Sequence, residues 1–95
     1  MKNYYGFENN KQHLAVMNAV RSIIGLDPWD FYVYYHNDGE FEGCIEIVLN
    51  RNTHIVFYNY VLEIKCTTSF NMKTVELITK ISDNIGTIWE AYRMA

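Results

Sequence analysis

Two stretches of this chain alternate between large apolar and polar residues, and this alternation predicts β-strands with one buried face. In residues 29–36 the apolar positions are Trp29, Phe31, Val33 and Tyr35. In residues 41–49 they are Phe41, Ile45, Ile47 and Leu49. The residues between them fall on the opposite side. We therefore expect a hairpin with one apolar and one polar face.

The connection between the two strands predicts their register. A two-residue turn at Asp38-Gly39 would place Glu42 opposite Tyr35, on the apolar face. A three-residue loop, Asn37-Asp38-Gly39, instead places Phe41 opposite Tyr35 and leaves Gly39 at the left-handed position of a bulged hairpin. The sequence therefore favours the longer loop. On the polar face this register would pair Tyr34 with Glu42, Tyr32 with Cys44, and Asp30 with Glu46.

A third apolar run, residues 54–66, follows the next turn. Pairing Leu49 with Ile55 and Ile47 with Phe57 continues the apolar face of the sheet, and sets Glu46 opposite Tyr58. The alternation then changes phase, because Asn59 would point into the core while Leu62 and Ile64 require the other phase. A run of this length can contain a β-bulge, so we place one near Tyr58-Asn59 and expect one long third strand.

An amphipathic stretch before the strands predicts a helix over residues 10–24. Either Asn9 or Asn10 is suited to cap its N-terminus. Gly25 supplies a left-handed stop, and Asp27-Pro28 prevents the helix from continuing.

A second amphipathic stretch predicts a helix over residues 71–93, with Asn71 as its cap and Phe70 and Val75 as a hydrophobic staple. The predicted order is α-β-β-β-α. This is an α+β fold in which an N-terminal and a C-terminal helix pack on one face of a three-stranded antiparallel sheet. A chain of 95 residues accommodates one such domain, covering residues 1–95.

Charge is distributed unevenly along the chain. Between Arg21 and Arg51 there is no lysine or arginine, although the whole chain carries eight. The same stretch holds six carboxylates: Asp27, Asp30, Asp38, Glu40, Glu42 and Glu46. It also holds six of the fifteen Trp, Tyr and Phe residues: Trp29, Phe31, Tyr32, Tyr34, Tyr35 and Phe41. An acidic, aromatic-rich segment is typical of a docking face for a basic partner.

The polar face of the sheet is the candidate binding site. If both helices pack on one side, the other side is left open. Tyrosine combines large contact area, few rotatable bonds and a polar tip, and an incoming lysine or arginine would relieve the repulsion between Asp30 and Glu46. The predicted partner-binding residues are Asp30, Tyr32, Tyr34, Asp38, Glu40, Glu42, Glu46 and Tyr58.

Other interpretations of this face stay open. Tyrosine is a good strand residue and acids keep a solvated face soluble, so the pattern is also typical of a surface with no partner. A homodimer whose sheet faces pack together would use the same tyrosines. Direct nucleic-acid binding is disfavoured, because the formal charge is −3 and the segment lacks the cations that hold phosphates.

No catalytic, cofactor or metal motif is present: GxGxxG, GKS/GKT and GxSxG are all missing. His13 falls on the inner side of the first helix, which predicts a packed or capping residue rather than a metal ligand. His36 and His54 are expected at opposite ends of the hairpin ladder, with His36 paired to Glu40, and so too far apart to share a metal. We therefore expect a protein that is not an enzyme and carries no cofactor.

The two cysteines, Cys44 and Cys66, lack CxxC spacing and are expected to be reduced and structural. Residues 1–6 lack the apolar core of a signal peptide, and no run reaches the length of a membrane span. These features predict a cytoplasmic protein that does not enter a membrane.

In size, charge and α-β-β-β-α order the chain resembles the small acidic inhibitors encoded by phages and mobile elements, anti-CRISPR proteins among them. Immunity proteins and antitoxins are similar at the same level. The resemblance implies an interaction protein that binds the basic surface of a nucleic-acid-handling effector. A homodimeric structural or regulatory protein is the alternative.

Overall fold

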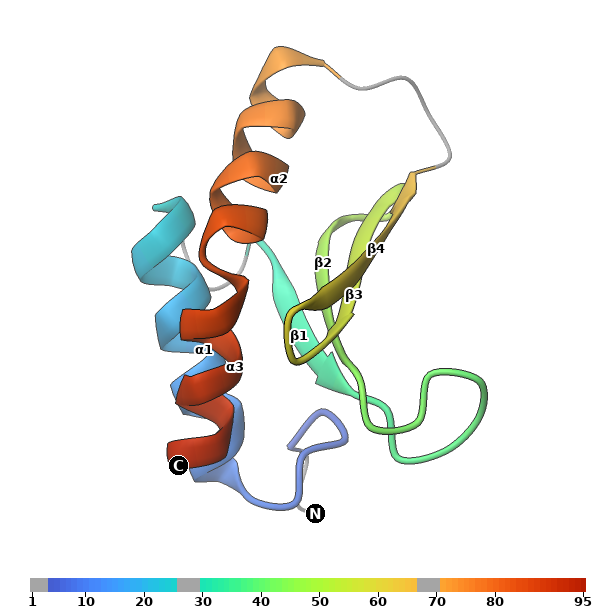
Figure 1. Ribbon diagram of the computed structural model, residues 1–95, viewed down its shortest axis with the longest axis vertical. Helices are drawn as coiled ribbons and strands as arrows, with labels where there is room; N and C mark the ends of the chain where they lie inside the picture. The colour runs from blue at the N-terminus through green and yellow to red at the C-terminus, as the bar shows by residue number, and fades with distance from the viewer. Residues whose placement is uncertain (1–3, 26–29, 67–70) are drawn as a thin grey trace.

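The computed structural model describes residues 4–25, 30–66 and 71–95. The elements in chain order are α1 (Asn10–Ile24), β1 (Tyr32–Tyr35), β2 (Ile45–Asn50), β3 (Thr53–Tyr58), β4 (Val61–Cys66), α2 (Met72–Asp83) and α3 (Ile85–Met94). The helices lie on one side of a single antiparallel sheet (Figure 1). The fold is α+β, as the sequence predicts, but with four strands and two C-terminal helices.

Helix α1 has the predicted bounds. The Asn9 side chain accepts a hydrogen bond from the backbone N–H of Gln12 at 3.0 Å, so Asn9 rather than Asn10 is the cap. At the other end Gly25 has a φ of 71° and donates to the carbonyl of Arg21 at 2.8 Å. The predicted contribution of Asp27-Pro28 lies outside the described residues.

The predicted long third strand is wrong, because the chain turns back at Asn59-Tyr60 and forms the hairpin β3–β4. Tyr58 and Val61 pair across this two-residue turn and therefore share a face although they are three positions apart. The turn, not a bulge, changes the phase of the alternation. Asn59 has a φ of 55°, a left-handed conformation that asparagine tolerates better than most residues.

The sheet order is β1-β2-β3-β4, and both predicted registers are shifted. Tyr35 pairs with Ile45 rather than with Phe41, and Ile47 pairs with Ile55 rather than with Phe57. Each shift covers an even number of residues, so every paired strand residue keeps its predicted face.

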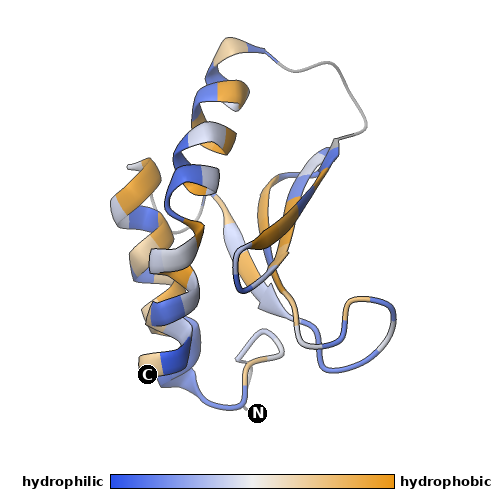
Figure 2. Cartoon of the chain, in the orientation of Figure 1, coloured by the Kyte–Doolittle hydropathy of each residue, from blue (hydrophilic) through white to orange (hydrophobic). Residues whose placement is uncertain are grey.

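The core lies between the inner face of the sheet and the helices (Figure 2). Its largest fully buried side chains are Phe57, Ile45, Ile47, Ile55, Ile81, Ile88, Val16, Val20 and Val33. All three helices and three of the four strands contribute to this set. The alternating apolar residues of β1–β3 therefore pack against the apolar stripes of α1, α2 and α3, as their spacing predicts.

The predicted C-terminal helix is interrupted at Asn84, which separates α2 from α3. Its backbone N–H donates to the carbonyl of Ile81 at 3.0 Å, and its side-chain amide donates to the carbonyl of Lys80 at 2.8 Å. Asparagine competes for local backbone partners in this way and disrupts a regular helix. The cap at Asn71 is confirmed, since its side chain accepts from the Thr74 N–H at 2.8 Å. The predicted staple residue Phe70 lies outside the described residues.

The N-terminal segment docks against the free edge of β1. The backbone N–H of Tyr35 donates to the carbonyl of Tyr5 at 2.8 Å, and Phe7 is buried in the core. His13 is buried as predicted, with its ring stacked on Tyr5 at 4.6 Å between centroids, and burial lowers its pKa. Gly6 makes this approach possible, with a φ of 86° and no room for a side chain.

None of the described helices is both long enough and apolar enough to cross a membrane.

Candidate protein-binding face

The polar side of the sheet carries exposed tyrosines. Tyr32 is 45% exposed and Tyr34 is 38% exposed. On β1 they alternate with the fully buried Val33, so they lie on the side of the sheet opposite the helices. We call this side the outer face. In register, Tyr32 lies opposite Val48 and Tyr34 lies opposite Glu46, rather than opposite Cys44 and Glu42 as predicted.

Glu46 lies at the centre of the outer face, between two histidines. His36 Nε2 is 2.7 Å from Glu46 Oε1, and His54 Nδ1 contacts Glu46 Oε2. Two predictions are therefore wrong: His36 pairs with Glu46 rather than Glu40, and His36 and His54 meet at one carboxylate instead of lying at opposite ends of the ladder. Both corrections follow from the observed register. Tyr34 and Val56 lie opposite Glu46, so His36 and His54 are each only two residues away from a direct partner of Glu46.

Both oxygens of the Glu46 carboxylate contact a histidine ring. His54 is also held on its other side, because its Nε2 lies 3.3 Å from the carbonyl oxygen of Arg51 while its Nδ1 faces the carboxylate. Burial raises the pKa of Glu46, but hydrogen bonds from His54 and His36 outweigh it and hold the pKa below its ordinary value. Glu46 therefore orders the centre of the outer face by bonding to both histidines.

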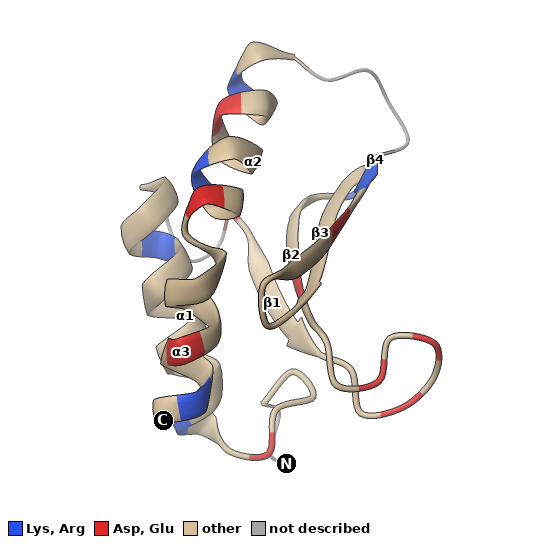
Figure 3. Cartoon of the chain, in the orientation of Figure 1, with Lys and Arg blue, Asp and Glu red and all other residues tan. Residues whose placement is uncertain are grey.

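The acidity is concentrated in the loop between β1 and β2. Beyond β1 the His36 N–H donates to the Cys44 carbonyl at 3.0 Å, and the Gly43 N–H donates to the His36 carbonyl at 2.8 Å. These bonds close a loop of residues 37–42, which we call the acidic loop. Its carboxylates Asp38, Glu40 and Glu42 are all exposed (Figure 3).

Contacts made by residues of the acidic loop itself also hold its conformation, in addition to the hydrogen bonds that close it at His36. The Glu42 N–H donates to the Gly39 carbonyl at 3.2 Å. The Phe41 ring lies 5.8 Å from the His36 ring, and Lys65 Nζ sits 3.6 Å from the Phe41 centroid. Phe41 was predicted on the core face opposite Tyr35, and that is wrong: it anchors the loop to side chains of the outer face.

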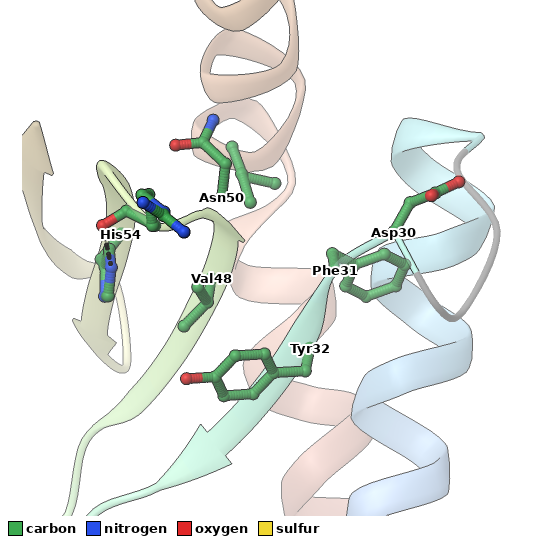
Figure 4. A pocket seen from close by; sticks show the side chains of 8 residues that line it. Asp30, Phe31, Tyr32, Val48, Asn50 and His54 are labelled. Atoms are coloured by element: carbon green, nitrogen blue, oxygen red, sulfur yellow. Dashed lines mark hydrogen bonds between the residues drawn. The ribbon is translucent and has the colours of Figure 1, made fainter. Parts of the chain in front are cut away.

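Two predicted site residues do not join this group. Asp30 is exposed at the other end of β1, beside a hollow of about 490 Å³ that Tyr32, Val48 and Asn50 help to line (Figure 4). Glu46 does not face it, so the predicted repulsion between Asp30 and Glu46 is wrong. Tyr58 pairs with Val61 rather than with Glu46, and its ring lies 5.0 Å from Trp89 of α3.

Cys44 follows the acidic loop in the chain. Cys44 is half-buried, and burial raises the pKa of its thiol, so the group is a poor nucleophile at neutral pH. Within residues 4–25, 30–66 and 71–95, no group of three or more His, Cys, Asp or Glu residues is arranged to hold a metal ion. The arrangement provides a tyrosine surface beside a cluster of negative charge.

Comparisons with protein-family models, with curated proteins and with solved structures give no match for this chain.

Proposed function

We propose that this chain is a non-enzymatic interaction protein that binds a basic protein surface through its acidic loop and the neighbouring tyrosines. The observation that carries the proposal is the exposure of Asp38, Glu40 and Glu42 on one ordered loop beside Tyr34. Negative charge attracts a basic partner over a distance, and tyrosine supplies contact area once the surfaces meet.

The order of the acidic loop supports tight binding. A loop that is already held by backbone hydrogen bonds and by Phe41 loses less conformational freedom when it docks. Tyr32 and Tyr34 add rigid side chains with few rotatable bonds. The partner therefore meets a surface that is largely preformed.

The partner class follows from charge. Large basic surfaces in cells belong mainly to proteins that handle nucleic acids, and the exposed carboxylates would compete there with phosphates. The same carboxylates repel nucleic acid itself. The proposed activity is thus inhibition of a nucleic-acid-handling effector by covering its binding site, in the manner of phage or mobile-element inhibitors such as anti-CRISPR proteins.

Reversing the charge of the acidic loop should abolish capture of such a partner. The variant is Asp38→Lys/Glu40→Lys/Glu42→Lys, whose three side chains are exposed and leave the core untouched. Affinity capture from lysate of the natural host or its invaders should recover a basic protein with the wild type, in a salt-sensitive way, and about tenfold less or lower with the variant.

The matched control reverses three exposed acids on the helical side, Glu8→Lys/Glu76→Lys/Asp83→Lys, with the same change in net charge. It should retain the partner. Equal loss of the partner in both variants would show that only net charge matters, and equal recovery by the loop variant and the wild type would refute a role for the loop.

A further inference from the structure

The outer edge of β4 is open for pairing. The strand stands last in the sheet, and none of the described helices or strands pairs with its far side (Figure 1). Because Tyr58 and Val61 flank a two-residue hairpin turn, they form a hydrogen-bonded pair. The alternation of the ladder then directs the backbone groups of Leu62, Ile64 and Cys66 away from β3. An edge of this kind is a template for another strand.

The side chains of β4 are complementary to a second, antiparallel copy of the same strand. Ile64 projects on the inner side of the sheet and is 39% exposed although it is large and apolar. Glu63 and Lys65 lie immediately on either side of it, and both point to the outer side. One strand thus carries an exposed apolar centre flanked by opposite charges at equal distances.

We propose that two copies of this chain pair through β4 about a two-fold axis at Ile64, forming a continuous eight-stranded sheet. Ile64 then lies opposite Ile64 of the second copy, in a pair whose backbone groups already point across the edge. Glu63 of each copy faces Lys65 of the other, at the positions where side chains approach most closely. The interface is isologous, as the commonest homodimers are.

This register is specified by the sequence of the strand. A shift of the pairing by two residues toward the turn would place Glu63 opposite Glu63 of the second copy and Lys65 opposite Val61, so both charge pairs would be lost. A shift of the pairing by one residue would place inner-face residues of one copy opposite outer-face residues of the other. Only the arrangement centred on Ile64 combines outward backbone groups with two pairs of opposite charge.

The dimer differs from one in which sheet faces pack together. Edge pairing about an axis perpendicular to the sheet leaves both outer faces open and on the same side. Two acidic loops would then be available to one partner or to two, which raises avidity without a new contact. The inference rests on β4 alone and does not depend on the proposed function.

Charge reversal on β4 tests the register directly. Sedimentation of the purified full chain over a range of concentrations should show a dimer for the wild type. Glu63→Lys alone or Lys65→Glu alone places like charges opposite each other twice, and should raise the dimer dissociation constant about thirtyfold. The double variant Glu63→Lys/Lys65→Glu should restore dimerisation, because each pair is again of opposite sign.

Mixing supplies a second test of the same register. The two single variants, each monomeric alone, should form a heterodimer together, since one carries lysine at both charged positions of β4 and the other carries glutamate at both. Circular dichroism confirms folding of each variant, and the double variant also controls for loss of the contact between Lys65 and Phe41. A monomeric wild type at millimolar concentration would overturn the proposal, as would single variants that dimerise as tightly as the wild type.

Discussion

Replacing Gly6 by alanine should detach the N-terminal segment and lower the free energy of unfolding by about 3 kcal/mol. A Cβ atom at this position would lie 1.9 Å from the carbonyl oxygen of Tyr35, and the backbone φ of 86° is itself strained for alanine. The obstacle is the backbone of β1, which cannot move aside without breaking the sheet. The bond from Tyr35 to Tyr5 and the burial of Phe7 would be lost together.

Gly39→Ala is the matched control, because Gly39 has a similar φ of 80° but nothing within 4 Å of the added Cβ. It should lower the free energy of unfolding by only about 1 kcal/mol. Denaturant unfolding measures both values, and hydrogen exchange at the Tyr35 amide reports the detachment. Equal effects of the two substitutions, or continued protection of Tyr35 in the Gly6 variant, would contradict the docked N-terminal segment.

Removing the charge of Glu46 should lower the free energy of unfolding by about 2 kcal/mol at neutral pH. Glu46→Gln preserves the shape of the side chain but weakens its bonds to His36 and His54. Glu40→Gln, on the exposed acidic loop, is the control and should change stability by no more than about 0.5 kcal/mol.

The contribution of Glu46 to the free energy of unfolding should also decrease as the pH falls. Its pKa in the folded protein lies below the ordinary value of 4.5. The unfolded state therefore takes up the proton first, and the stabilisation is fully present above pH 4.5 and is lost as the pH falls toward the folded pKa. Unfolding curves of wild type and Glu46→Gln should converge in this acid range. A difference that stays constant down to acid pH would contradict the hydrogen-bonded carboxylate.

The elements with strong local signals could be predicted from the sequence. Helix α1 begins after an asparagine cap and ends at a glycine, and both signals act within a few residues of the helix end. The faces of the strands could also be predicted, because the alternation of side chains does not change when pairing slides by an even number of residues. For this reason Tyr32 and Tyr34 project outward even though their predicted partners were wrong.

Register and turns could not be predicted with the same success, since they depend on contacts between distant residues. The connection after β1 is longer than a tight turn because His36 bonds to Gly43 and Cys44 and the Phe41 ring packs on the outer face. Asn59 is a residue that favours turns, but a β-bulge at the same place accounts equally well for the change of phase in the alternation of apolar residues. The interruption at Asn84 likewise depends on one side chain within an otherwise regular helical pattern.

The histidine pair at Glu46 is the main part of the site that could not be predicted from the sequence. Glu46 on β2, His54 on β3 and His36 just beyond β1 meet only in the true register. Their spacing in the chain gave no signal for this contact. The acidic loop, by contrast, was visible as an excess of carboxylates, because charge composition does not depend on register.

The most direct test of the account is photo-crosslinking from the outer face. A photoreactive phenylalanine analogue at the position of Tyr34 should crosslink to a basic protein in a lysate that contains the partner. The same analogue at the position of Leu14, an exposed residue of α1 on the helical side, should not. Crosslinks to the partner from position 14 and none from position 34 would contradict the proposed binding face.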